Sequence, residues 1–264
     1  MTTRVLALRL AGPLQAWNVT SAYNRRETDL VPTKAGVLGL LAAAQGRRRC
    51  DPIEDLLSLR FGIRVDQPGS LLRDYHTVSS LNGDPLLSAS VNAKGVQKRT
   101  SPKKLTHVTE RFYLQDACFV AAVEGSDDLI GNLAEAVCHP AFPLFLGRRS
   151  CPPSHRLVIP DGDNATWDGG LVRVLREVPW QGKSTHTSLP RPGAGRFGRK
   201  EVRPSGLAIT FDDLTGGDER TDVRVSFDPT NRDMLTRRVS TDWVVPPGLT
   251  PSDDSQFDDF GLLR

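Results

Sequence analysis

Apolar and polar residues alternate along much of the first 160 residues, as they do in strands that bury one face. Leu6, Leu8 and Leu10 give the clearest example, and Gly12-Pro13 ends that segment. Alternation predicts strands over residues 5–11 and 59–65, and strands are also predicted over 71–78, 112–123 and 154–160.

Two helices are predicted between these strands. The first covers residues 34–46, where apolar residues recur at helical spacing behind Thr33, a suitable N-cap. The second begins after Ser126 and ends at His139-Pro140. The resulting order predicts an α+β fold class, with a ferredoxin-like βαββαβ domain over residues 1–160 that carries an insertion beside its central hairpin.

A sheet of this kind carries its helices on one face and can leave the other face open. Arg9, Arg60 and Arg64 alternate away from the core positions, so they are candidates to line the open face. Ordinary exposed arginines would show the same pattern.

The chain beyond residue 160 is predicted to be a smaller β-rich region, residues 161–245. Its predicted strands are 171–178, 206–211, 222–227 and 239–245. The tail, residues 246–264, contains four aspartates near its end and is expected to be at least partly flexible.

The inserted segment, residues 79–109, is too long for a hairpin turn and contains several turn-forming residues. The overlapping stretch 88–111 has only one acidic residue, Glu110. Its basic residues are Lys94, Lys98, Arg99, Lys103, Lys104 and Arg111. Such a local surplus attracts a polyanion, although a solvated loop can also carry lysines. The net charge of the whole chain, +3, hides this asymmetry.

Composition excludes several classes of protein. The chain of 264 residues is 38% hydrophobic and 25% charged, which suits a folded core and roughly one or two domains. No apolar run approaches the roughly 18 residues of a membrane span, and the N-terminus does not resemble a signal peptide. Four cysteines without CxxC spacing predict free thiols in a reducing cytoplasm.

No cofactor or metal ion is expected, because the histidines lack HxxxH or HExxH spacing and no P-loop or GxSxG motif is present. The string GxGxxG at residues 193–198 follows Pro-Arg-Pro rather than a strand, so a dinucleotide site is discounted. A metal-free ribonuclease would need an acid and a base, such as His76 with Tyr75, Tyr23 or a lysine. In a strand, however, Tyr75 and His76 point to opposite faces, so at most one of them serves a given site.

Two loops combine glycine with cations. Gly147 precedes Arg148 and Arg149, and a glycine lets backbone N–H groups approach a phosphate while arginines supply forked donors. Residues 195–200 place Phe197 among cations, which suits a single-stranded nucleic acid. Phe197 as a core residue is the alternative.

Several motifs together resemble the CasD-type family, the type I-E CRISPR Cascade subunit of the RAMP superfamily. The motifs stand in the family's order at Leu8–Trp17, Pro32–Leu41, Leu72–Val78 and Phe145–Pro152, with a looser match at 189–201. The resemblance covers roughly residues 1–205 and gives no account of residues 206–264.

The resemblance implies an RRM-related ferredoxin-like domain with a protruding β-hairpin thumb at about residues 79–111. It implies a non-catalytic subunit that grips the 5′ handle of the CRISPR RNA and caps the Cascade backbone. The partners implied are the backbone subunit CasC and the large subunit CasA, with CasB and CasE indirectly, and target DNA through the assembled complex.

The resemblance also assigns RNA-contacting roles to individual residues. The candidates are Gln15, Trp17, Arg25, Arg26, Lys34, Lys94, Lys98, Arg99, Lys103, Lys104, Arg111, Gly147, Arg148, Arg149, Arg199 and Lys200. Two other functions stay open: a metal-independent endoribonuclease that processes CRISPR repeats, and a protein-interaction scaffold whose basic loop is incidental.

Overall fold

The computed structural model describes residues 3–17, 24–79, 82, 87–91, 97–99, 103, 105–182, 206–228, 230–231 and 233–249. Helices and mostly antiparallel sheets make up this part of the chain, which confirms the predicted α+β class. Within these residues, no helix is long and apolar enough to cross a membrane.

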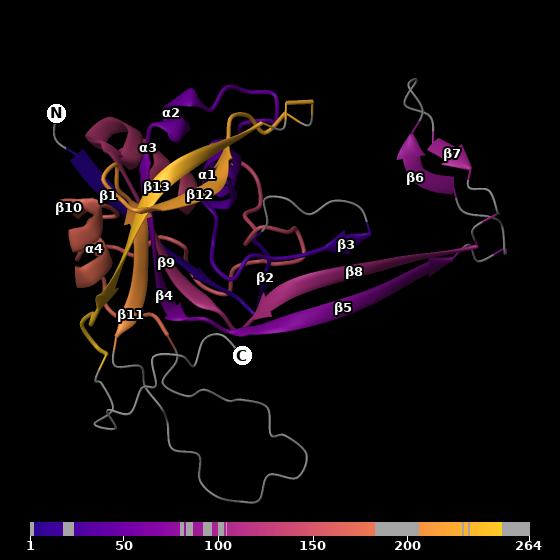
Figure 1. Cartoon of the computed structure of the whole chain (residues 1–264). Helices are drawn as coiled ribbons and strands as arrows, with labels where there is room; N and C mark the ends of the chain where they lie inside the picture. The colour runs from indigo at the N-terminus through magenta and orange to yellow at the C-terminus, as the bar shows by residue number, and fades with distance from the viewer. Residues whose placement is uncertain are drawn as a thin grey trace, which may run out of the picture.

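A seven-stranded antiparallel sheet forms the body of the molecule (Figure 1). Its strands, in spatial order, are β10 (Trp167–Asp168), β1 (Thr3–Ala11), β9 (Cys118–Ser126), β4 (Arg60–Gln67), β11 (Leu207–Asp212), β13 (Met234–Val244) and β12 (Asp218–Arg224). The strands predicted over 5–11, 59–65, 206–211 and 239–245 are confirmed as β1, β4, β11 and β13. Because β11 pairs with β4, the β-rich region extends the sheet begun by β1.

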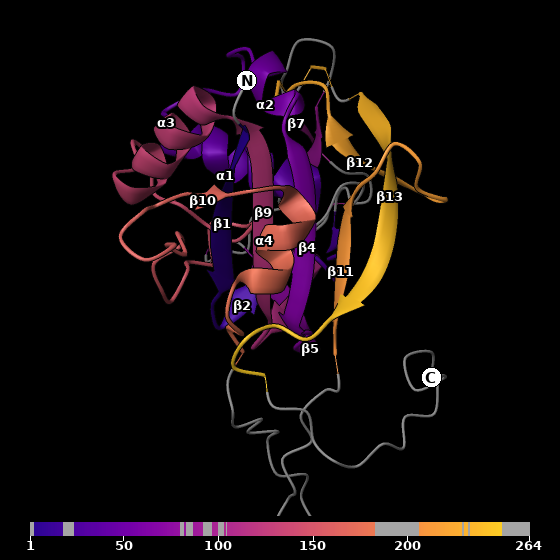
Figure 2. The same ribbon diagram turned by 90° about the vertical axis from the view of Figure 1, so that its left-hand side faces the viewer.

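Helices cover both faces of this sheet (Figure 2). On one face, α1 (Lys34–Ala44), α2 (Glu54–Leu57) and α3 (Asp127–Cys138) pack on Leu6, Leu8 and Leu10 of β1. On the other face, α4 (Leu171–Glu177) packs on Val5 and Ala7. The alternation of β1 therefore serves two cores.

Helix α4 corrects the prediction of a strand over residues 171–178. Leu171, Val174 and Leu175 are buried and recur at helical spacing, so they form the inner side of a helix. This helix covers the face that was expected to stay open. Arg64, expected on that face, is 0% exposed; its guanidinium donates to the carbonyl oxygens of Leu175 and Val178 at 2.6 Å and pairs with Asp66.

The strand predicted over residues 154–160 is also wrong. Only an isolated bridge between Val158 and Leu8 forms there, and β10 takes the edge of the sheet beside β1. The two residues of β10 pair only with the start of β1, where they lie opposite Arg4 and Val5.

A long two-stranded ribbon projects from the sheet (Figure 1). It consists of β5 (Ser70–Ser79), which confirms the strand predicted over 71–78, and β8 (Thr106–Gln115), paired antiparallel along their whole length. Gly69, with φ of 73°, and Asp116, with φ of 54°, stand where the chain turns between body and ribbon. The strand predicted over 112–123 is therefore two strands, β8 and β9. Between β5 and β8 in the sequence, β6 (Leu87–Val91) pairs with β7 (Gln97–Arg99).

Candidate nucleic-acid interface

The base of the ribbon brings cations from three separate segments around β8. On the side of β8 away from β5 lie β2 (Leu14–Gln15) and β3 (Arg25–Arg26). Strand β3 runs parallel to β8, with Arg26 beside Arg111. The loop that contains Arg148 binds the same strands through hydrogen bonds. No sequence spacing links these three segments, so only the fold reveals the cluster.

Arg111 lies on one face of the ribbon, directly across from Asp74. Its side chain is half-buried, and its Nε is buried without a hydrogen-bond partner among the residues described. His76 lies on the same face, where its imidazole contacts the Asp74 carboxylate. Arg111 therefore lies among polar side chains, and its Nε–H group has no acceptor among the described residues.

The opposite face of the ribbon carries an ion pair and a stacked arginine. Arg73 pairs with Glu110, and the Arg25 guanidinium lies over the Phe112 ring at 5.2 Å from its centroid. Arg25 also donates to Glu27 at 2.9 Å. Arg25 remains exposed, so its charge is available to a ligand. The sequence analysis did not identify Phe112 as part of this cluster. Finding it requires knowing which face of β8 it lies on, which the pairing of β5 with β8 shows.

Arg148 fastens β3 to β8. Its guanidinium donates to the carbonyl oxygens of Phe112, Arg26 and Glu27, each at 2.9 Å. It also lies over the Tyr113 ring, 4.9 Å from the centroid. Because the Arg148 guanidinium binds three backbone carbonyls of β8 and the β3 segment, its role is to position the interface.

Gly147 and Arg149 flank Arg148 in different ways. Gly147 has φ of 88°, and a Cβ there would stand 1.8 Å from the carbonyl oxygen of Ala16. Only glycine fits this close approach of two backbones. Arg149 directly follows Arg148 in the chain and is exposed.

Three predicted contact residues are buried, which corrects their expected role. Gln15 donates to the carbonyl oxygens of Leu10 and Ala117 at 3.0 and 2.8 Å, and accepts from the Trp17 indole at 3.0 Å. Trp17 itself is 1% exposed. Lys34 is 6% exposed, and its ammonium donates to the Leu59 carbonyl at 2.6 Å and to Asp212 at 2.9 Å. Their side chains stabilise the fold around the interface and do not reach its surface.

Only some of the remaining predicted cations are among the described residues. Lys103 is exposed, and Lys98 and Arg99 belong to β7. Lys94, Lys104, Arg199 and Lys200 lie outside the described residues, as do Tyr23 and the tail from residue 250.

Tyr75 and His76, one of the acid–base pairs considered above, lie on opposite faces of β5. Tyr75 is 57% exposed on the face of β5 opposite His76, so the two side chains do not share a site. In the described ranges, no three His, Cys, Asp or Glu side chains come together as a metal site.

The chain is similar to proteins of CRISPR systems. A family model described as CRISPR-associated protein (Cas_Cas5) matches residues 5–240. The Cascade subunit CasD of Escherichia coli strain K12 is 36% identical over 168 residues, which make up 58% of this chain and 69% of that protein.

Two solved structures are similar over nearly the whole chain. One, titled "CRISPR RNA-guided surveillance complex", has a TM-score of 0.67 at 30% identity and covers 95% of each chain. The other, titled "Crystal structure of Cas protein", has a TM-score of 0.63 at 30% identity and covers 93% of this chain and 100% of the other.

Proposed function

The chain belongs to the Cas5 family of CRISPR-associated proteins, and from this membership we propose that it is the subunit of a type I-E Cascade complex that grips the 5′ handle of the CRISPR RNA. In this role it holds RNA without cleaving it and caps one end of the backbone. The observation that carries the proposal is the arginine cluster at the base of the ribbon, formed by Arg25, Arg26, Arg111 and Arg149.

The topology supports an RRM-related domain beneath this cluster. The spatial order β10-β1-β9-β4 corresponds to the fourth, first, third and second strands of a βαββαβ unit, with α1 and α3 as its helices. The ribbon then corresponds to the thumb, longer than predicted because it begins at Ser70.

The chemistry of the cluster suits a single RNA strand. Backbone phosphates supply most of the affinity for cations, and splayed bases and 2′-hydroxyls supply specificity. Arg25 over Phe112 keeps its charge exposed while its plane is fixed, which lowers the entropy lost when a phosphate binds.

The face of the ribbon that carries the Arg73–Glu110 ion pair also has exposed apolar residues, which suit contacts with protein partners. Leu71 and Tyr75, each 57% exposed, and Val108, 36% exposed, lie on the same face. We propose that CasC and CasA contact this chain directly, CasB and CasE indirectly, and that target DNA meets it only in the assembled complex.

The test is to purify the full chain with its partner subunits and measure the CRISPR RNA that remains bound. We expect Arg111→Ala to weaken binding of a handle oligonucleotide about tenfold, because a charge-assisted contact is lost. Arg173→Ala is the matched control, since Arg173 is exposed on α4, across the sheet. Equal loss in both variants, or none in either, would contradict the role of Arg111.

The alternative of an endoribonuclease rests on the contact between His76 and Asp74. Incubating the chain alone with repeat RNA and EDTA decides it. We expect intact RNA; cleavage at one position that is lost in His76→Ala would establish the enzyme instead.

A further inference from the structure

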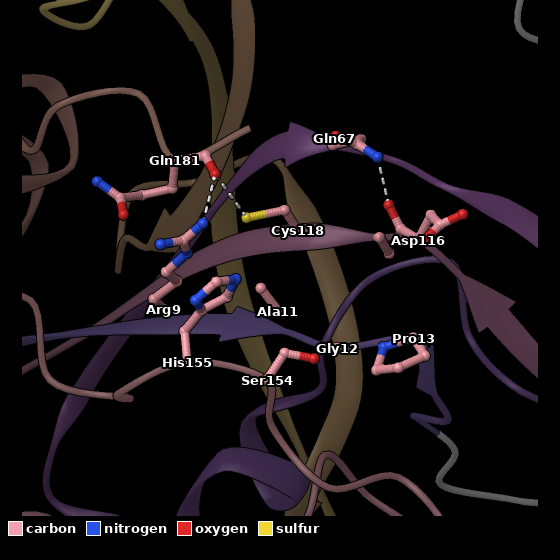
Figure 3. A pocket seen from close by; sticks show the side chains of 11 residues that line it. Arg9, Ala11, Gly12, Pro13, Gln67, Asp116, Cys118, Ser154, His155 and Gln181 are labelled. Carbon is pink, nitrogen blue, oxygen red and sulfur yellow. Dashed lines mark hydrogen bonds between the residues drawn. The ribbon is translucent and has the colours of Figure 1, made fainter. Parts of the chain in front are cut away.

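A pocket lies at the end of β1, near the turns that join the body to the ribbon (Figure 3). Its volume is about 110 Å³, which is large enough for one phosphate group. Residues from β1, β9 and the loops beside them line it. The polar ones include Arg9, Gln67, Cys118, Ser154, His155 and Gln181.

Arg9 supplies the positive charge of this pocket. Its Nη2 donates to the carbonyl oxygen of Gln181 at 3.2 Å, whereas its Nε is buried and has no hydrogen-bond partner among the residues described. A buried donor without a partner costs free energy unless a ligand satisfies it. Arg64, by contrast, uses its donors on Asp66 and on three backbone carbonyls.

Among the described residues, Arg9 forms no ion pair with Asp66 or with Asp116, the acid that lines the pocket. Asp66 is engaged by Arg64 and by the backbone N–H of Gln181, which donates at 2.6 Å. Asp116 lies at the far side of the pocket from Arg9 (Figure 3). Burial raises the pKa of the Cys118 thiol to about 11, so this group is neutral and donates to the Gln181 carbonyl at 3.3 Å.

We propose that this pocket binds a phosphate group through Arg9, and that the RNA strand supplies it; the second part rests on the proposed function. Ser154 and His155 stand beside Arg9 in the lining, and the Ser154 hydroxyl offers a further donor (Figure 3). The sequence that follows Gln181 is rich in cations. Gln181 directly precedes Gly182, after which residues 183–205 contain six Lys or Arg and one Glu.

The first test measures RNA affinity of the full chain between about 50 and 200 mM salt. A lost phosphate contact lowers the slope of log affinity against log salt by about 0.7 for a single strand. We expect this change in Arg9→Gln, equally for RNAs of different sequence, together with a loss of affinity of about threefold to tenfold. Arg48→Gln, an exposed arginine beyond α1, is the control and should keep the wild-type slope.

The second test uses inorganic phosphate as the probe in calorimetric titration. We expect the wild type to bind it, Ser154→Ala to bind more weakly, and Arg9→Gln to lose binding. Ser154 is exposed, so its variant keeps the test valid even if Arg9→Gln does not fold. If neither variant changes the salt slope or the phosphate titration, the pocket proposal is overturned while RNA binding stands. Phosphate binding without any RNA binding would overturn the proposed function and leave the pocket as a phosphate site.

Discussion

Basic side chains of the same type serve opposite purposes in this protein, and burial decides which. Arg25 and Arg149 keep their charges exposed, whereas Lys34 and Arg237 belong to a buried network with Asp212 and Asp222. Arg237 donates to Asp222 at 2.6 Å and also contacts Asp212. This network joins the start of α1 to β12 and β13, so its cations stabilise the fold.

Lys34→Met is expected to lower the free energy of unfolding by about 3 kcal/mol, because Asp212 and the Leu59 carbonyl lose a buried partner. Urea denaturation measures the change. RNA affinity, measured at a temperature where the variant is folded, should match the wild type. If the variant were as stable as the wild type but bound RNA more weakly, Lys34 would be a residue of the RNA interface after all.

Gly147→Ala is expected to destabilise the protein by at least about 2 kcal/mol, because the new Cβ would stand 1.8 Å from the Ala16 carbonyl oxygen in a left-handed backbone conformation. Thermal unfolding measures this. Gly131→Ala is the control: nothing lies within 4 Å of its Cβ position in α3, so helix propensity predicts a gain of up to about 1 kcal/mol. Equal stability of the two variants would refute the role given to Gly147.

The four cysteines should react with iodoacetamide in two classes. Cys50 and Cys138 are exposed, whereas Cys118 and Cys151 are buried and burial raises the pKa of both thiols. At pH 8 we expect mass spectrometry to show rapid labelling of the first pair only. Because the folded Cys118 thiol resists ionisation up to about pH 11 while the unfolded thiol ionises near 9, its contribution to stability falls as pH rises through that window. Early labelling of Cys118 would contradict the structure around the pocket.

At the scale of elements, β3 is too short to hold its place beside β8 by backbone pairing alone. Besides its short pairing with β8, it is held by a backbone bond from the Glu110 N–H to the Asn24 carbonyl at 2.7 Å and by the three Arg148 contacts. The position of Arg25 and Arg26 therefore depends on Arg148.

Arg148→Ala should release β3 and weaken RNA binding about tenfold without removing an RNA contact. Hydrogen exchange is the decisive readout, since the Glu110 amide should lose protection in the variant. Arg148→Lys should behave similarly, because an ammonium does not reproduce the guanidinium's several donors on one plane. Unchanged protection with weaker RNA binding would instead make Arg148 a direct contact.

Local sequence patterns predicted those elements that do not depend on contacts with distant segments of the chain. The alternation in β1 and β4, the strand character of β5 and the apolar spacing of helices α1 and α3 could be read directly. The predicted cap of α1 is confirmed, since Thr33 accepts from the Gly36 N–H, whereas Ser126 makes no side-chain capping bond at α3. The apolar residues of 171–178 fit strand and helix alike over so short a run, and only packing on Val5 and Ala7 decides for a helix. The turn at Asp116 and the pairing of β3 with β8 depend on contacts between distant segments, so no local pattern contains them.

At the scale of the whole molecule, the fold assembles an interface that the sequence contains only in pieces. The charge count identified the inserted segment, and the loop motif identified Gly147, Arg148 and Arg149. The fold brings the base of the ribbon beside that loop, and it forms a separate pocket, lined by Arg9, at the end of β1. This arrangement, and not the composition, determines which cations are exposed and which are buried in the core.

The most direct test of the account is photo-crosslinking in the assembled complex, with 4-thiouridine placed in the 5′ handle of the CRISPR RNA. Mass spectrometry should find crosslinks in peptides of this chain that contain Arg25 and Arg26, Arg111, or residues 147–149. Crosslinks from the handle to partner subunits alone, in a complex that contains this chain, would contradict the account.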